Sequence, residues 1–460
     1  MMLSHLTRTR LLAAARGQFG SRLGFILAAA GSAVGLGNIW GFPTQAASNG
    51  GAAFVLVYLV LAFLLAYPVL MAELLLGRHA HGNAVIALTR ISEGPITKAL
   101  GASTGLVGIV VASLILSFYA IVAGWMLGFT AAYPLSALGM QTSADWLTTF
   151  AIPRNLALMA IFMLMTIGII LGGVHNGIER WSTRLMPSLI ITMLALGAYV
   201  LTLDGAMEGL AVYLLPDFSK VLSGDLVLAA LGSAFFSLSL GVGTMLIYGS
   251  YLSDDEHLPS IGVQVALIDV GLAVLAGFLI LPAMYVAAAR GVEIFDASGA
   301  LLSEDTLIFT VLPALFATLG TVGSLVATAF FGLMSIAALT SSISMLEVPV
   351  AFLVERFNWS RRRAASFAGL AIGCLSAVVV VNFNQLFGLV VSLSTRYGQP
   401  LLGVMLCIYA GWVWHRDSLL QELKKNDPDA DRGWFWRIWP FYVRLVCPVI
   451  IVIIFARSIG

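Results

Sequence analysis

The amino-acid sequence predicts an all-α membrane protein with about eleven transmembrane helices, and three observations lead to this class. Of the 460 residues, 60% are hydrophobic and only 10% are charged, whereas a soluble domain carries about 25% charged residues. The run Ala52 to Ala72 contains no charge and is about as long as a helix that crosses a bilayer. Such unbroken runs differ from the short alternating segments of a transmembrane β-barrel, so we expect a bundle of helices in lipid.

Hydropathy, taken in chain order, places the individual spans. We expect them at residues 22–46, 52–76, 101–133, 155–173, 182–203, 226–251, 260–288, 320–354, 364–382, 386–414 and 439–459. Residues 289–319 are predicted to form a long outer loop between the seventh and eighth spans. The apolar run from Leu307 to Leu319 within it predicts a short helix that packs on the bundle.

The placement of lysine and arginine predicts the orientation, because cytoplasmic loops carry an excess of both. With the N-terminus inside, the cytoplasmic segments collect Arg8 to Arg22, Arg78, Arg90, Lys98, Arg180, Arg184, Arg356, Arg361 to Arg363 and Arg416 to Arg437. The opposite side carries only Arg154, Lys220, Arg290 and Arg457. We therefore expect a cytoplasmic N-terminus.

Two of the predicted spans are interrupted by glycines. The first span contains the segment Gly31 to Asn38, and the sixth contains the segment Ser237 to Gly243. Glycine lowers helix propensity by about 1 kcal/mol relative to alanine, and paired interrupted helices indicate a midplane site in an inverted-repeat transporter. Glycines also serve as packing notches between membrane helices, so the spacing alone leaves both interpretations open.

Charge and composition argue against several other functions. The formal net charge is +1, which gives no electrostatic basis for binding nucleic acid. Cys374, Cys407 and Cys447 lie in apolar stretches without metal or disulfide spacing. The six histidines form no metal-binding or catalytic pattern. We expect no enzyme activity, no nucleic-acid partner and a lipid bilayer as the surroundings.

Several motifs recur in the order of one known family. The segment Arg22 to Pro43 ends in Gly-Asn-Ile-Trp-Gly-Phe-Pro. It is followed by Gln45, Asn49-Gly50-Gly51, Phe54, Tyr58, Pro68, Glu73 and Gly77-Arg78, and later by Gly177 to Arg180 with Pro187, Phe235 to Gly241 and Ala338 to Ser342. This pattern resembles the neurotransmitter:sodium symporter family, in its branch of bacterial sodium-dependent amino-acid transporters, over essentially the whole chain.

The resemblance implies a fold of two inverted five-helix repeats, with spans one and six broken at the midplane. The implied divisions are a cytoplasmic N-terminal segment with the inner gate at residues 1–21, a first repeat at 22–203, a second repeat at 204–414, a cytoplasmic loop at 415–438 and an eleventh span at 439–460.

The resemblance also implies two sodium sites, with the oxygen ligands expected for a hard cation. The first site maps onto Ala33, Asn38, Ser237 and Asp269, and the second onto Gly31, Val34, Ala337, Thr340 and Ser341. Asp269 is a carboxylate where some relatives have a neutral amide, and Ala273 occupies the position of their charge-balancing glutamate or chloride. We therefore expect no chloride requirement. A buried acid paired with some other cation is the alternative role for Asp269.

The implied substrate pocket is apolar and of medium size, which suits a neutral hydrophobic amino acid. Its residues are Ala33, Gly35, Leu36, Gly37, Ile115, Tyr119, Phe236, Ser237, Ser239, Val242, Ser341 and Met345. Gly35 stands where monoamine transporters have an aspartate for the substrate amine, so it favours amino acids over monoamines. Ile115 and Val242 are equally compatible with simple packing between helices.

The gates of the family are only partly matched. Arg16 and Glu355 correspond to the cytoplasmic gate pair, and Phe19, Ser250 and Tyr251 complete that gate. At the outer gate, Gly41, Ser233 and Val391 stand in place of the family's polar residues. Arg396, further along the tenth span, either replaces the missing gate cation or contacts an acidic group on the substrate.

We therefore expect a sodium-coupled symporter that imports a neutral, hydrophobic amino acid by alternating access. The expected location is a bacterial inner membrane, with the protein as a monomer or homodimer. One alternative is a sodium symporter of a β- or γ-amino acid, a taurine-like sulfonate or a betaine. Another is an amino-acid sensor without transport activity.

Overall fold

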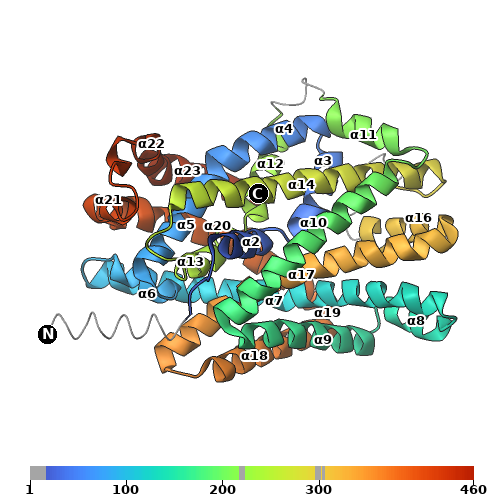
Figure 1. The fold of residues 1–460 in the computed structure, drawn as a ribbon, viewed down its shortest axis with the longest axis horizontal. Helices are drawn as coiled ribbons and strands as arrows, with labels where there is room; N and C mark the ends of the chain where they lie inside the picture. The colour runs from blue at the N-terminus through green and yellow to red at the C-terminus, as the bar shows by residue number, and fades with distance from the viewer. Residues whose placement is uncertain (1–16, 217–222, 296–301, 303–305, 460) are drawn as a thin grey trace.

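The computed structural model describes residues 17–216, 223–295, 302 and 306–459, and almost all of them are helical. Most long helices run roughly along the longest axis of the molecule (Figure 1). A shorter helix, α2 (Arg22–Ala33), lies among them and packs against α10, α14 and α17. The predicted all-helical membrane architecture is confirmed.

Within the described ranges, eight helices are long and apolar enough to cross a membrane. They are α4 to α5 (Ala52–Ala80), α7 (Pro95–Ala137), α9 (Ile152–Leu171), η3 to α10 (Val174–Val200), α14 (Leu258–Ala289), α17 (Gly320–Phe357), α18 (Arg361–Val381) and the segment Trp434–Arg457 within α22 to α23. A ninth span is formed by a bent pair, α2 and the segment Gly37–Ser48 that contains η1 and α3, with 58° between its halves.

The other two predicted spans are divided into shorter helical segments. The sixth consists of α12 (Gly224–Ser237) and α13 (Thr244–Gly249), with a non-helical connection between them. The tenth consists of α19 (Phe383–Val391), η5 (Ser392–Gly398), α20 (Gln399–Ile408) and η6 (Tyr409–Val413). The number of eleven transmembrane helices therefore stays a prediction.

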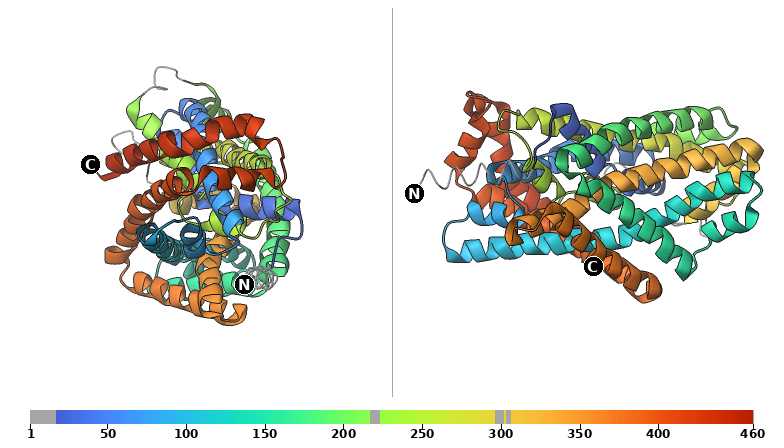
Figure 2. Two further views of the ribbon diagram at one scale, coloured as in Figure 1. Left: turned by 90° about the vertical axis from the view of Figure 1, so that its left-hand side faces the viewer. Right: turned by 60° about the horizontal axis from the view of Figure 1, so that its bottom comes forward.

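Short helices gather at the two ends of the bundle (Figures 1 and 2). One end, named here the α21 end, carries α6 (Ala84–Arg90), α21 (Arg416–Lys424) and η7 (Ala430–Arg432). The opposite α16 end carries α8 (Gln141–Thr148), α11 (Ala206–Leu214), η4 (Leu307–Val311) and α16 (Leu312–Thr318). The helix expected from Leu307 onward is thus present, and it packs against α14 and α17.

Three helices, α2, α6 and α18, begin with a polar side-chain cap. The Ser21 hydroxyl accepts a hydrogen bond from the amide of Gly24, Asn83 caps α6 and Ser360 caps α18. Each cap satisfies an amide that has no partner within its own helix. Large apolar side chains such as Leu164 and Ile191 remain exposed along the helices, as expected for surfaces that face lipid.

A buried ion pair joins three distant segments at the α21 end. Arg78 Nε, in α5, donates to Glu422 Oε1 at 2.8 Å, and at most 1% of either side chain is exposed. Arg78 also donates to the backbone oxygens of Glu422 at 2.8 Å and Glu256 at 2.6 Å. Lys425 adds ion pairs to Glu422 at 2.9 Å and to Asp254 at 2.8 Å. These contacts fasten α21 to α5 and to the loop that follows α13.

Three cationic or hydrogen-bonding neighbours surround the Glu422 carboxyl. Burial alone would raise its pKa, but His79, Arg78 and Lys425 outweigh burial and lower the pKa to about 2. Because the pKa is lowered in the folded protein, the ionised carboxylate contributes its full stabilisation at pH values above 4.5, the ordinary pKa of a glutamate side chain. That contribution is lost as the pH falls toward 2.

We predict that Glu422→Gln lowers the melting temperature of the purified protein at pH 7. Removing one partner of a buried ion pair leaves the other charge uncompensated and costs roughly 3 kcal/mol. Melting can be followed with a thiol-reactive dye, because unfolding exposes the buried Cys407 and Cys447. The control is Asp417→Asn, whose side chain is 83% exposed on the same helix. Equal melting temperatures for the two variants would contradict a stabilising role for the ion pair between Arg78 and Glu422.

Candidate functional site

The two broken spans face each other in the middle of the bundle. Helix α2 ends at Ala33, Val34 adopts an extended conformation, and η1 (Gly37–Gly41) begins three residues later. In the sixth span, α12 ends at Ser237 and α13 begins at Thr244. Both interruptions lie within the glycine-containing segments predicted from the sequence. An unwound segment leaves backbone carbonyls available to a bound ion or ligand.

The connection between α12 and α13 depends on glycine. Gly241 and Gly243 have φ angles of 71° and 83°, which residues with a side chain rarely adopt. A Cβ on Gly241 would lie 2.2 Å from the backbone oxygen of Gln399. Ser239 also has a positive φ, of 51°, and its hydroxyl donates to the carbonyl of Ser32 at 3.2 Å. The chain can follow this path only with glycine at position 241.

Two buried polar side chains hold this connection in place. Glu73, in α5, accepts hydrogen bonds from the amides of Gly241 at 2.8 Å and Leu246 at 3.3 Å. Gln399, in α20, donates from Nε2 to the carbonyl of Leu240 at 2.8 Å. These bonds replace the helical partners that the break removes. Glu73 was matched by the family pattern, but its contact with the sixth span was not predicted.

Three of the four residues predicted for the first sodium site, Asn38, Ser237 and Asp269, form a compact cluster of buried polar groups. Asn38 Nδ2 lies 2.7 Å from both Ser237 Oγ and Asp269 Oδ1. Ser237 Oγ donates to Asp269 Oδ2 at 2.6 Å, and Tyr58 OH lies 3.1 Å from the same hydroxyl. Asp269 and Asn38 are fully buried. Asp269, Ser237 and Tyr58 supply oxygens and one negative charge when Asp269 is ionised, which suits a monovalent hard cation. Asn38 directs its amide nitrogen at this group, so it would supply a ligand oxygen only with its amide turned over.

The predicted second site joins α17 to the break in the first span. Ser341 Oγ lies 3.3 Å from the carbonyl of Gly31 and 3.2 Å from that of Val34. Thr340 Oγ1 donates to the carbonyl of Ala337 at 3.0 Å. Ser341 and Thr340 therefore lie against the broken first span, and Ala337 lies one turn earlier in α17. Ala33 of the first site is adjacent to Val34 in the chain.

A small cavity of about 50 Å³ lies between the breaks and α7. Its lining contains Ala33, Gly35, Leu36, Gly37, Ile115, Tyr119, Phe236, Ser239, Val242, Ser341 and Met345, all of them predicted, and also Asn38, Phe118 and Gln399. The predicted Ser237 belongs to the oxygen cluster and not to this lining. The amide of Leu36 donates to the hydroxyl of Tyr119 at 3.3 Å, so α7 contacts the unwound backbone.

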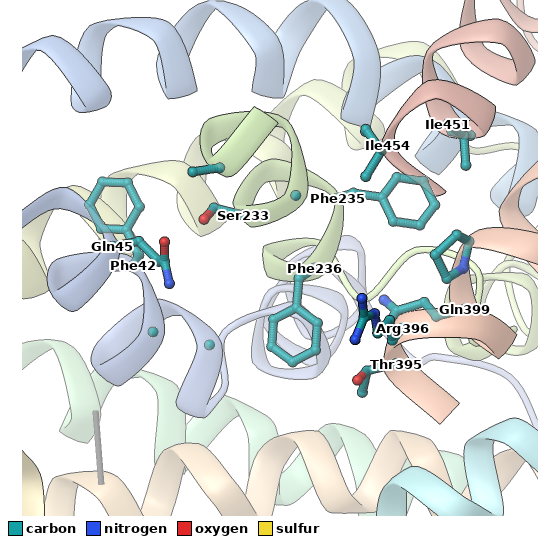
Figure 3. Close-up of a pocket in the computed structure, with 15 residues that line it drawn as sticks. Phe42, Gln45, Ser233, Phe235, Phe236, Thr395, Arg396, Gln399, Ile451 and Ile454 are labelled. Carbon is teal, nitrogen blue, oxygen red and sulfur yellow. The ribbon is translucent and has the colours of Figure 1, made fainter. Parts of the chain in front are cut away.

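A second cavity, named here the vestibule, has a volume of about 400 Å³ and adjoins the first. Gly37, Phe236 and Gln399 line both cavities. Figure 3 shows the ring of Phe236 in the middle of this region, and the side chain is 44% exposed. Gly41, Ser233 and Arg396 lie in the vestibule lining, whereas Val391 does not.

The residues of the predicted cytoplasmic gate lie near the α21 end. The ring of Phe19 packs against Phe25, Tyr248 and Tyr251, with centroids 5.1 to 6.5 Å apart. Ser250 Oγ donates to the carbonyl of Ile247 in its own helix.

Only one residue of the ion pair predicted for this gate lies in the described part of the chain. Glu355 Oε2 accepts from the backbone and side chain of Asn83 at 2.8 and 2.9 Å. Arg16 lies outside the described residues, so its pairing with Glu355 stays a prediction.

A second ion pair near this gate was not predicted. Glu347, fully buried in α17, accepts from Arg361 at 2.9 and 2.6 Å and from the hydroxyl of Tyr251 at 2.5 Å. Arg361 also donates to the carbonyl of Ile170 at 2.8 Å. An acid within a predicted span was the available signal for Glu347. Arg361 belongs to a run of three arginines, which was used only to predict the orientation of the protein in the membrane.

Comparisons with known proteins agree with this arrangement. A model of the sodium:neurotransmitter symporter family matches residues 16–149 and 129–460. The uncharacterised sodium-dependent transporter YhdH of Bacillus subtilis is 34% identical over 463 residues, which cover 96% of this chain and 98% of that protein. An uncharacterised sodium-dependent transporter of Haemophilus influenzae is 31% identical over 473 residues, with the same coverage. The crystal structure of MhsT in complex with L-phenylalanine has a TM-score of 0.82 and 37% identity, and covers 96% of this chain and 100% of that one.

The broken helices, the oxygen cluster and these matches define a secondary transporter. The chain belongs to the sodium:neurotransmitter symporter family. It is a multi-pass membrane protein and a sodium-dependent transporter, and its family consists of transporters rather than enzymes. The family resemblance found in the sequence is confirmed.

We predict that Gly241→Ala destabilises the protein by roughly 1–3 kcal/mol, because alanine is strained at a positive φ and its Cβ would collide with Gln399. The matched control is Gly168→Ala in α9, where a Cβ meets nothing within 4 Å and alanine favours the helix by about 1 kcal/mol. Thermal melting in detergent compares the two. A Gly241→Ala protein that melts at or above the wild-type temperature would show that the connection is not constrained in this way.

Proposed function

We propose that this protein is a sodium-coupled symporter that imports a neutral, hydrophobic amino acid by alternating access. The observation that carries the proposal is the buried cluster of Asn38, Ser237 and Asp269, directly beside a cavity at two broken helices. An ionised carboxylate in the membrane interior needs a compensating cation. Sodium supplies that cation and links ion binding to the adjacent cavity.

Two sodium ions are proposed, one at each oxygen cluster. At the first, Asp269 provides the negative charge, so chloride is not needed there. At the second, the ligands are neutral carbonyls and hydroxyls from Gly31, Val34, Ala337, Thr340 and Ser341. A membrane potential of 100 mV contributes about 2.3 kcal/mol for each charge that moves through it.

The proposed substrate is an amino acid whose carboxylate meets the unwound backbone at Leu36 and Gly37 and the hydroxyl of Tyr119. Gly35 supports an amino acid over a monoamine, because a Cβ there would lie 2.7 Å from Ser341 Oγ and 2.8 Å from Tyr119 OH. An aspartate there would require both hydroxyl groups to move. Apolar lining by Ile115 and other residues supports a hydrophobic side chain. MhsT, a relative by structure, holds L-phenylalanine.

Alternating access in this proposal exchanges the openings at the two ends of the bundle. The vestibule adjoins the central cavity beside the accessible ring of Phe236, and Phe19 packs among aromatic rings near the α21 end. Both observations support an arrangement that faces the α16 side. With the N-terminus in the cytoplasm of a bacterial cell, that side is the exterior. The two inverted repeats and a monomeric or dimeric state belong to the same proposal.

One observation favours a second class of substrate. Arg396 and Gln399 place a cation and an amide at the vestibule, which a purely hydrophobic amino acid does not require. These groups suit a β- or γ-amino acid, a sulfonate or a betaine with a distant acid. A sensor without transport activity has no comparable support in the described residues.

Sodium-dependent binding of amino acids to the purified protein tests the proposal. We predict saturable L-phenylalanine binding that needs sodium and is equal with and without chloride. Asp269→Asn removes the charge that faces the ion, so the sodium concentration for half-maximal binding rises about tenfold or more. Asp204→Asn, an exposed acid in a loop, is the control with the same change in charge. Binding that ignores sodium would refute symport, and binding of taurine alone would move the protein to the second substrate class.

A further prediction concerns Tyr119. Tyr119→Phe removes the hydroxyl that contacts Leu36 while keeping the ring, so the affinity for the amino acid falls about tenfold. Tyr133→Phe on the same helix, outside the cavity lining, leaves the affinity unchanged. The measurement is a binding isotherm at saturating sodium. Equal affinities for both variants would remove Tyr119 from the proposed substrate site.

A further inference from the structure

The last candidate span carries positive charges without an acidic partner. Residues 434–460 contain three arginines, Arg437, Arg444 and Arg457, and no aspartate or glutamate. Arg437 and Arg444 are exposed, and within the described part of the chain neither side chain forms an ion pair. Because a charged side chain in a membrane span is costly, these two arginines need an anion that the described chain does not provide.

The acids at this end of the molecule are engaged by other basic side chains. Helices α21 and α22 (Trp434–Phe441) lie at the same end (Figure 1), and residues 415–433 contain five acids. The recorded pairs are Asp417 with His415 at 3.9 Å, Glu422 with Arg78 at 2.8 Å, Asp427 with His257 at 3.7 Å, Asp429 with Arg432 at 3.5 Å and Asp431 with Lys424 at 3.0 Å. The charges are thus paired on the side of α21 and unpaired on the last span.

The guanidinium of Arg444 is held in place by an aromatic ring. Its central carbon lies 4.0 Å from the ring centroid of Trp412, which is a cation–π contact. The indole nitrogen of Trp412 also donates to the carbonyl of Arg444 at 2.9 Å. A ring against one face of a guanidinium leaves the donors at its edge accessible. Arg444 is therefore positioned to bind an anion.

The contact with Trp412 also indicates the depth of Arg444 in the membrane. Trp412 lies in η6, the last segment of the tenth predicted span, and the polar helix α21 begins only four residues later, at Arg416. Tryptophan is enriched at the boundary between the hydrocarbon and the headgroups. Arg444 therefore lies near the level of the lipid phosphates. The exposed apolar side chains beside it on the same span are Phe441, Leu445 and Val449.

We propose that Arg444 and Trp412, together with Arg437, form a binding site for the headgroup of an anionic phospholipid at the α21 end of the bundle. A phosphodiester accepts charge-assisted hydrogen bonds from a guanidinium, and the apolar side chains beside Arg444 contact the acyl chains. Arg437 precedes Arg444 by about two helical turns, on the same side of the helix, and adds to the attraction. The described linings of the central cavity and the vestibule include neither arginine, so the site does not rest on the proposed transport function.

Native mass spectrometry of the whole chain measures the lipid preference. The protein is stripped of lipid in a neutral detergent and incubated with equimolar phosphatidylglycerol and phosphatidylcholine that carry the same acyl chains. The wild type binds more phosphatidylglycerol than phosphatidylcholine. Arg444→Gln lowers the ratio of the two bound lipids about fivefold, and adding Arg437→Gln lowers it about fivefold again.

Two further variants separate this site from general charge and from packing. Arg457→Gln removes an exposed arginine near the opposite end of the same span, so the ratio stays at its original value. Arg444→Lys keeps the charge and most of the preference, although it loses the planar donors. An unchanged ratio in the double variant, or an equal fall in Arg457→Gln, overturns the proposal. A ratio in Arg444→Lys as low as in Arg444→Gln also overturns it, because packing and not charge would then set the preference.

Competition distinguishes a lipid from a soluble phosphate. Glycerol phosphate carries the phosphate group without acyl chains, so even in large excess it leaves the bound phosphatidylglycerol in place. Displacement by glycerol phosphate would overturn the assignment to a lipid and would identify a site for soluble phosphates. Equal binding of phosphatidylglycerol and phosphatidylcholine by the wild type would overturn the anion site itself.

Discussion

The structure depends on one constraint: two helices are broken inside a membrane protein, and the freed backbone groups need polar partners there. An unpaired amide or carbonyl in lipid costs several kcal/mol, so the breaks persist only where side chains replace the lost helical bonds. Glu73 and Gln399 serve the sixth span, and Ser341 contacts carbonyls of the first. The groups that make the break tolerable thus surround the space available to ions and substrate.

The same constraint explains why the site combines strong polarity with deep burial. Asn38, Ser237 and Asp269 come from three different spans and meet only because both breaks lie at the same depth. Their hydrogen bonds tie the broken spans to α14. A cation bound among them would therefore influence the relative positions of three helices at once. This is the physical basis for coupling ion binding to a conformational change.

Much of the site could be predicted, because glycine-rich breaks and short motifs are local features of the sequence. The segments Gly31 to Asn38 and Ser237 to Gly243 do contain the breaks. Contacts between distant segments left no such trace. Gln399 looked like any polar residue of a weakly patterned span, and the pair of Glu347 and Arg361 became visible only when α17 and α18 were placed side by side. The docking of α21 by Arg78 and Glu422 was missed for the same reason.

Glu73 and Arg78 stand five residues apart on α5, about 7.5 Å along the helix axis. Glu73 accepts a hydrogen bond from the connection between α12 and α13. Arg78 binds α21 and the loop that follows α13 through an ion pair and hydrogen bonds. Helix α5 is therefore attached both to the beginning of α13 and to the loop that follows α13. If α13 tilts during a transport cycle, these contacts connect its movement to α5 and α21. Loss of the contacts of Glu73 or of Arg78 would allow α13 to move independently of α5 and α21.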